Sequence, residues 1–236
     1  MCNLYSLRKG PAAILDLARA MGNQAGNVEG GSVYPDYSAP IVRSEGEGRV
    51  LTTARWGMPS SRKAILDAAT RRADKLRAKG KEVDFDQLLK MEPDSGTTNV
   101  RNTSSRHWQP WLTPEHRCLV PFTSFSEPGR DAEGKYRPIW FRMKGEDPEP
   151  LAFFAGIQVQ GWQGVRKIKT GWETADLFAF LTTEPNAEVG AVHPKAMPVI
   201  LTQPDEIETW LTAEWDDAAA LQRPLPDGAL VQFIPS

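Results

Sequence analysis

Short apolar runs dominate the middle and the end of the chain. Runs rich in Val, Ile, Leu and Phe occupy 119–126, 138–143, 151–159, 177–183, 197–201 and 230–234. Their length and β-branched content are typical of strands. Residues 39–43 and 50–56 alternate partly between apolar and polar and flank a turn at 45–48, which predicts a hairpin. The pattern therefore predicts a sheet at the centre of the protein.

Helical spacing occurs in four segments. Apolar positions near a 3.6-residue period predict helices over 11–21, 61–79, 204–211 and 213–221, the first opening after Gly10 and closing at Gly22. The 61–79 segment carries seven Lys and Arg residues, and a basic surface helix is more often a solvated face than a nucleic-acid contact. We expect an α+β fold in which residues 1–236 form a single domain, with a curved, mostly antiparallel sheet as its core and helices at its periphery.

Composition narrows the function classes. The chain has 236 residues, 40% hydrophobic and 25% charged, which is ordinary for a soluble globular protein. No apolar run approaches the ~18 residues of a membrane span and no signal peptide is evident, so we expect a cytoplasmic protein without membrane contact. A net charge of −2 argues against a broad surface that coats nucleic acid and is compatible only with a local basic groove. Two cysteines and three scattered histidines show no zinc-ligand spacing, and we expect no metal.

Cys2, directly after Met1, is the most informative single position. Removal of Met1 would place an α-amine and a thiol on one residue. An α-amine with a pKa of about 7.7–8.0 is roughly a tenth neutral at pH 7, whereas a lysine near 10.4 is neutral at well under a thousandth. After condensation with an aldehyde, the thiol can close a thiazolidine ring. Taken alone, Cys2 can also be merely the second residue.

Four further polar positions stand out. Asn99 and Arg101 follow a Gly-Thr-Thr turn, where an arginine can hold a phosphate bidentately. Glu127 closes the strand-like run from Cys118 and is expected at its rim, where a partly buried carboxylate can have a raised pKa and shuttle protons. His193 lies just before the strand at 197–201. Taken singly, Asn99 is typical of a turn former, Glu127 of a solvated rim acid and His193 of a loop or core histidine.

Several motifs in order resemble the SRAP (SOS response-associated peptidase) family, whose members process abasic sites in DNA. The resemblance covers nearly the whole chain. It rests on Met1-Cys2, 34–42 with Ala39-Pro40, Trp56-Gly57-Met58-Pro59, Asn99-Val100-Arg101, 117–121 leading to Glu127, Thr182-Thr183 with Asn186, and His193 leading to 197–201.

The resemblance implies a covalent chemistry. Cys2 would bond to the ring-opened abasic deoxyribose, and Asn99 would orient the terminus. Glu127 would act in the acid-base steps of sugar opening and imine formation, with His193 as a second proton-transfer group near the sugar oxygen. The thiazolidine crosslink would protect the abasic site from strand cleavage, and no cofactor is implied.

The resemblance also implies a DNA partner. Single-stranded DNA with abasic sites would lie in a basic groove, with Arg101 on phosphate and Pro40 as a further DNA contact. Trp56 and Met58 are candidates for a wedge or stacking group, although each type of residue in such a position is more often part of the core. We expect a monomer, associated with the nucleoid when it is bound to DNA.

The chain departs from the family pattern at several points. Asn3-Leu4 replaces Gly-Arg, so a phosphate-binding arginine is missing, and Ser126 and Pro128 flank Glu127 in place of an aromatic residue and tryptophan. One extra residue separates His193 from Met197, a spacing that could displace the imidazole. The stretch 61–95 is longer than the usual connection, which predicts a helical insertion.

Two other function classes fit Cys2. An N-terminal-nucleophile hydrolase or peptidase would use it to attack an amide. A noncatalytic single-strand-binding module would leave it without a role. A denaturing gel separates the three classes: the crosslinker gives a shifted band with an abasic strand, a hydrolase gives only a released amide product, and a module gives neither.

Overall fold

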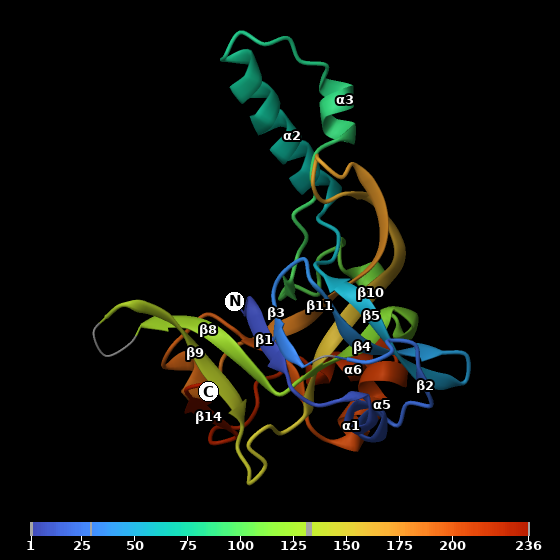
Figure 1. Ribbon diagram of the computed structural model, residues 1–236, viewed down its shortest axis with the longest axis vertical. Coiled ribbons are helices and arrows are strands. Elements are labelled where there is room, and N and C mark those ends of the chain that lie inside the picture. The colour runs from blue at the N-terminus through green and yellow to red at the C-terminus, as the bar shows by residue number, and fades with distance from the viewer. Residues whose placement is uncertain (1, 29, 131–133, 236) are drawn as a thin grey trace.

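The core of the protein is a sheet that curves until it closes on itself (Figure 1). The computed structural model describes residues 2–28, 30–130 and 134–235. Nine strands form this sheet, in the order β12-β11-β10-β7-β4-β5-β2 with β13 and β6 beside it. Strand β11 also pairs in parallel with β5, at Leu177–Arg55 and Phe178–Trp56, so β11, β10, β7, β4 and β5 make a closed ring. The other four pairings of the ring are antiparallel. The predicted α+β class with a curved, mostly antiparallel core is confirmed.

The elements follow one another along the chain in this order. They are β1 (Leu4–Leu7), α1 (Pro11–Ala18), β2 (Gly22–Asn23), β3 (Gly31–Val33), β4 (Ser38–Glu45), β5 (Gly48–Trp56), α2 (Arg62–Arg77), α3 (Phe85–Lys90), β6 (Asn99–Val100), the 3-10 turns η1 (Gln109–Trp111) and η2 (Pro114–His116), β7 (Arg117–Phe122), β8 (Ser124–Arg130), β9 (Tyr136–Met143), β10 (Ala152–Val165), β11 (Trp172–Thr183), α4 (Ala187–Gly190), β12 (Met197–Pro198), β13 (Ile200–Leu201), α5 (Pro204–Thr212), α6 (Trp215–Ala218), η3 (Ala219–Leu221) and β14 (Leu230–Phe233).

A second sheet contains the first strand, β1. Its order is β14-β9-β8-β1-β3, so β1 lies between β8 and β3. The apolar run 119–126, predicted as one strand, is in fact two strands in different sheets, β7 and β8. The chain crosses between the sheets at Thr123, whose amide and hydroxyl both donate to the carbonyl of Ser6, at 2.8 and 3.1 Å. The single-strand prediction is wrong because unbroken apolar character does not reveal a change of sheet.

Aromatic side chains fill the space between the two sheets. Phe122 and Phe154 stack with ring centroids 3.8 Å apart, and Tyr5 meets the edge of Trp56 at 5.2 Å. Cys2 belongs to the same buried cluster. Fully burying one such ring contributes roughly 1.5–3 kcal/mol. The N-terminal strand is therefore fixed by packing as well as by its sheet pairing.

Helices lie at the periphery, as expected. In Figure 1, α1, α5 and α6 sit together beside one end of the barrel. Trp210 of α5 donates to the carbonyls of Cys118 and Gly156, at 3.0 and 3.2 Å, which ties this layer to β7 and β10. The predicted end of α1 at Gly22 is wrong: the helix ends at Ala18, and Gly22 starts β2. No helix in the described part of the chain is long and apolar enough to cross a membrane.

Helices α2 and α3 form an arm that projects from the body (Figure 1). Helix α2 begins after Ser61, whose hydroxyl caps the amide of Ala64 at 3.2 Å. The helix predicted over 61–79 is thus present over Arg62–Arg77. Only Ala69 and Ala73 of α2 are buried, and no residue of α3 is. The arm consequently contributes little to the core.

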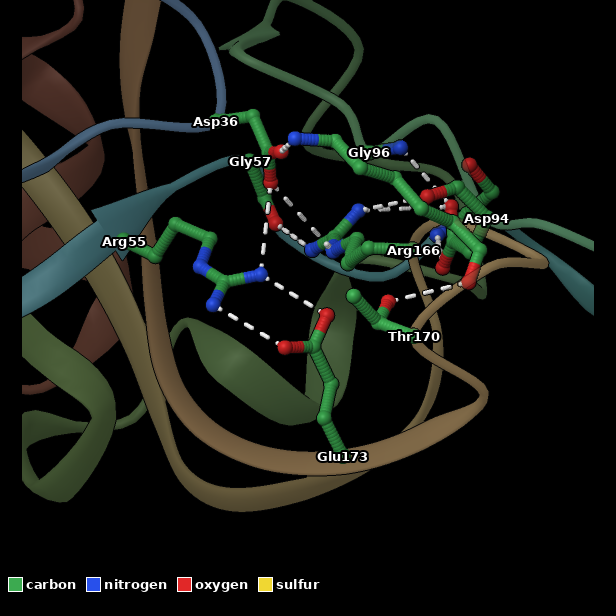
Figure 2. A network of polar contacts seen from close by, with 10 residues as sticks. Asp36, Arg55, Gly57, Asp94, Gly96, Arg166, Thr170 and Glu173 are labelled. Carbon is green, nitrogen blue, oxygen red and sulfur yellow. Dashed lines mark hydrogen bonds and ion pairs between the residues drawn. The ribbon is translucent and has the colours of Figure 1, made fainter.

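A buried arginine hydrogen-bonds the two chain segments that meet at the base of the arm (Figure 2). Arg166, just after β10, donates to the carbonyl of Gly57 and, at 2.9 Å, to the carbonyl of Asp94. The Asp94 carboxylate accepts from the amides of Ser60 and Gly96, at 2.9 and 2.8 Å. Gly96 has a φ of +75°, and a Cβ there would lie 2.5 Å from the Arg166 guanidinium. The close approach of these segments therefore requires glycine.

Candidate active site

Strand pairing determines where Cys2 lies. Strand β1 pairs antiparallel with β8, with Leu4 opposite Ser126 and Ser6 opposite Ser124. Continuing this register carries Cys2 alongside the second half of β8, which contains Glu127. The Cys2 side chain is fully buried, and its thiol lies 3.5 Å from the carbonyl oxygen of Leu4. The N-terminal thiol therefore faces the interior between the sheets.

Asn99 holds the backbone of Cys2. Strand β6 pairs in parallel with β11, with Asn99 opposite Phe180. From there the Asn99 side-chain amide donates to the carbonyl oxygen of Cys2 at 2.7 Å and to the hydroxyl of Thr98 at 2.9 Å. The other end of the amide, Oδ1, is buried and has no hydrogen-bond partner among the described residues. An acceptor is thus available beside the residue that would become the terminus.

Glu127 is more deeply buried than expected. It lies within β8, fully inaccessible, and not at the rim of a strand. Burial raises the pKa of its carboxyl from 4.5 to about 7. Burial also raises the pKa of the Cys2 thiol, and the charge of Glu127 raises it further. Near neutral pH the carboxyl exchanges its proton readily, while the neighbouring thiol keeps its own.

His193 faces Glu127. Its Nδ1 lies 3.6 Å from Oε2 of Glu127 and 3.1 Å from the carbonyl oxygen of Ala196. Because a carbonyl oxygen only accepts, Nδ1 carries the hydrogen when this second bond is made. The extra residue before Met197 therefore does not move the imidazole away from the carboxyl. The structure brings Cys2, Asn99, Glu127 and His193 together.

Arg101 lies at the surface next to the histidine segment. Its guanidinium pairs with Glu184 at 3.2 Å and donates to the carbonyl of Lys195 at 3.3 Å. Its side chain is 45% exposed. An exposed pair of this kind contributes only about 0–1 kcal/mol, so an anion can displace Glu184 at small cost.

Three predicted DNA contacts lie in the core. Trp56 is 1% exposed, stacks on Phe180 with centroids 5.2 Å apart and donates to the carbonyl of Thr98 at 2.9 Å. Met58 is fully buried and bridges Thr97, and Pro40 is buried in β4. Their prediction as DNA-contacting side chains is therefore corrected, and Trp56 and Met58 are core residues. The closure of β5 onto β11 buries Trp56, whose indole N–H binds the Thr98 carbonyl just before Asn99.

Sequence reasoning missed several residues around the site. Tyr5, on β1, has a buried hydroxyl without a hydrogen-bond partner in the described residues, and the same holds for Thr182 Oγ1 and Asn186 Nδ2 near the end of β11. Leaving such a group unsatisfied costs about 1–3 kcal/mol, so these atoms have capacity for a bound ligand. Thr182 and Asn186 lay in a family motif without an assigned role, and the position of Tyr5 in an apolar stretch gave no signal.

Within residues 2–28, 30–130 and 134–235, no group of three or more His, Cys, Asp or Glu side chains is placed to hold a metal ion.

Solved structures share this fold. A protein from Bacteroides thetaiotaomicron has a TM-score of 0.65 at 20% identity, covering 98% of this chain and 91% of its own. A protein from Bordetella bronchiseptica has a TM-score of 0.63 at 22% identity, covering 98% of both chains. A phage-related protein from the same organism has a TM-score of 0.60 at 18% identity, covering 98% and 93%. At these identities the likeness concerns the fold alone, and no curated protein matches the sequence.

The closed barrel and the buried cluster around Cys2 define a β-rich protein with a candidate N-terminal thiol site. The model of the family described as SOS response associated peptidase (SRAP) matches residues 1–233. The chain belongs to the SRAP family. Membership associates it with the SOS response to DNA damage and with a peptidase-like role.

Proposed function

We propose that this protein captures abasic sites in single-stranded DNA as a covalent crosslink through Cys2, after removal of Met1, and so protects them from strand cleavage. The observation that supports this proposal most is that two groups meet at Cys2. The Asn99 amide binds its carbonyl oxygen, and the Glu127 carboxyl beside it has a pKa of about 7. The protein would act as a monomer in the cytoplasm, associated with the nucleoid when bound to DNA.

The reaction balances without an oxidant or a reductant. The freed α-amine attacks C1′ of the ring-opened sugar, and loss of one water leaves an imine. The thiol sulfur then adds to the same carbon while its proton passes to nitrogen, which closes a thiazolidine. Glu127 supplies the proton for the departing water and can collect the proton of the thiol. Burial of the cluster excludes water and keeps the amine and thiol close to the sugar.

Asn99 has two tasks in this scheme. Its Nδ2 fixes the Cys2 carbonyl at 2.7 Å, and its unpaired Oδ1 can accept a hydrogen from the new α-amine. An amine held this way keeps its lone pair directed away from the amide and toward the substrate. The unsatisfied polar atoms of Thr182 and Asn186 offer further partners for sugar and phosphate oxygens.

The raised thiol pKa weighs against the hydrolase alternative. A cysteine hydrolase needs its nucleophile as thiolate, which a lowered pKa or a neighbouring general base provides. Burial and the charge of Glu127 both raise the pKa of the Cys2 thiol. A thiol that stays protonated suits a second step, in which sulfur adds to an imine that the amine has already formed.

Denaturing gels with an abasic oligonucleotide test the proposal. The parent should give a shifted band, Cys2→Ala none, and Cys118→Ala a shifted band, since Cys118 is a second buried thiol in β7. An uncleaved N-terminal tag should abolish the shift, because its cysteine nitrogen is an amide. Equal crosslinking by Cys2→Ala would rule out the N-terminal thiol.

A further inference from the structure

A cavity of about 840 Å³ lies where the helical arm meets the extended β10–β11 hairpin. Ile65 and Leu66 of α2 and Leu89 of α3 form part of one wall, and Trp162 and Trp172 of the hairpin form part of the other. The size is typical of pockets that receive a ligand or an anchoring side chain. Neither Cys2 nor the three residues grouped around it (Asn99, Glu127 and His193) line it, so this cavity is distinct from the candidate active site.

The cavity wall keeps large apolar side chains in contact with solvent. Leu66 is 45% exposed and Trp172 is 54% exposed. Burying such groups against a partner would be favourable at about 25 cal/mol per Å² of apolar area. Exposed aromatic and aliphatic groups gathered at one pocket are typical of interaction sites.

Arg166 connects the two walls at the base of the cavity. Arg166 joins Gly57 and Asp94, at the two ends of the arm, and its guanidinium also lies over the ring of Trp162, 4.6 Å from the centroid (Figure 2 shows the Arg166 contacts with Gly57 and Asp94). A preformed pocket binds with less loss of conformational entropy than one that must be ordered.

The uncompensated charge at the cavity is positive. Four charged residues line it, and its two carboxylates are already engaged: Glu92 pairs with Arg72 at 3.3 Å and Asp94 with Arg166 at 3.7 Å. The two cations, Arg62 and Lys90, have no ion pair within the part of the chain that the structure describes. A ligand that carries negative charge beside its apolar groups would complement these two cations.

We propose that this cavity is a docking site for an acidic peptide segment of another protein, one that inserts large apolar side chains between the arm and the hairpin and sets Asp or Glu residues against Arg62 and Lys90. A nucleic-acid strand fits less well, because such grooves run cations along the path of the phosphates. Here aliphatic side chains line the cavity beside the tryptophans, and its two free cations belong to the helices of the arm, Arg62 to α2 and Lys90 to α3. The proposal does not depend on the chemistry of Cys2.

Selection from a displayed library of random dodecapeptides tests the site on the full chain. Selected peptides are synthesised with fluorescein, and their affinities are measured by anisotropy. We expect aromatic or aliphatic anchors flanked by Asp or Glu. Leu66→Ser, Trp172→Ser and the double variant Arg62→Glu, Lys90→Glu should each weaken binding by about tenfold or more.

Matched variants separate this site from general surface effects. Tyr136→Ser removes an exposed aromatic residue of β9, and Arg71→Glu reverses an exposed charge of α2 outside the cavity; both should bind the peptides as the parent does. Abasic-strand capture should be unchanged in the Leu66 and Trp172 variants. A selection without enriched peptides, peptides that ignore the cavity variants, or tighter Trp172-dependent binding of oligothymidylate would each overturn the proposal, whatever becomes of the crosslink.

Discussion

Replacing Glu127 by Gln tests the electrostatics of the site without relying on any substrate. Burial raises the pKa of this carboxyl from 4.5 to about 7. Because the pKa is raised in the folded state, the carboxyl's contribution to stability is fully present below about pH 4.5 and is lost as the pH rises through 7. Glutamine has nearly the same shape and does not titrate.

The size of the effect follows from the shift. The pKa of Glu127 rises from 4.5 to about 7, and at 1.36 kcal/mol per pKa unit this difference amounts to about 3 kcal/mol. We therefore expect the free energy of unfolding of Glu127→Gln, relative to the parent, to rise by about 3 kcal/mol between about pH 4.5 and pH 8. For a chain of 236 residues this corresponds to about 6–12 °C in Tm.

Urea unfolding and thermal melts across that pH range measure the difference. Glu47→Gln is the matched control, because Glu47 is exposed on the β4–β5 turn and its substitution should give no trend with pH. A Glu127→Gln advantage that stays constant with pH, or grows toward acid, would refute the reasoning that burial dominates this carboxyl.

Four other variants probe the remaining parts of the account. Cys2→Ser should leave at most an imine that borohydride traps, because the amine survives and the ring-closing sulfur does not; a crosslink that survives denaturation without borohydride would contradict this. Arg101→Ala should reduce the slope of single-strand affinity against log salt by about 0.7, the value for one lost phosphate contact, and an unchanged slope would make Arg101 structural. His193→Ala should form the adduct but release it more slowly in a chase with excess abasic strand, and release at the parental rate would remove its role in reversal. Arg166→Met should lower the free energy of unfolding by about 3–5 kcal/mol, because it leaves the buried Asp94 carboxylate without its ion-pair partner. An effect under 1 kcal/mol would show that the Arg166 contacts are dispensable.

The sheet was predictable in part. Long apolar runs gave β9, β10 and β11 because buried strands need them. Strand β1 was missed, since its four residues become a strand only by pairing with β8 and β3, which lie far apart in the sequence. The closure of the ring through β5 and β11 likewise depends on two residue pairs that no local pattern records.

The site residues were predictable by type but not by environment. The motifs identified Glu127, yet its place at the end of the strand-like run from Cys118 indicated a rim position, and only the packing of the sheets shows it fully buried. Trp56 has the same side chain whether it stacks on a base or on Phe180, so tertiary structure alone decides between them. Arg166 carried no sequence signal, because its partners Gly57 and Asp94 come from distant segments.

Intact mass after incubation with a single-stranded abasic oligonucleotide tests the central claim most directly. The account predicts a species equal to the chain without Met1 plus the oligonucleotide minus one water, with peptide mapping placing the adduct on Cys2. An unmodified chain, or an adduct on a lysine or on Cys118, would contradict it.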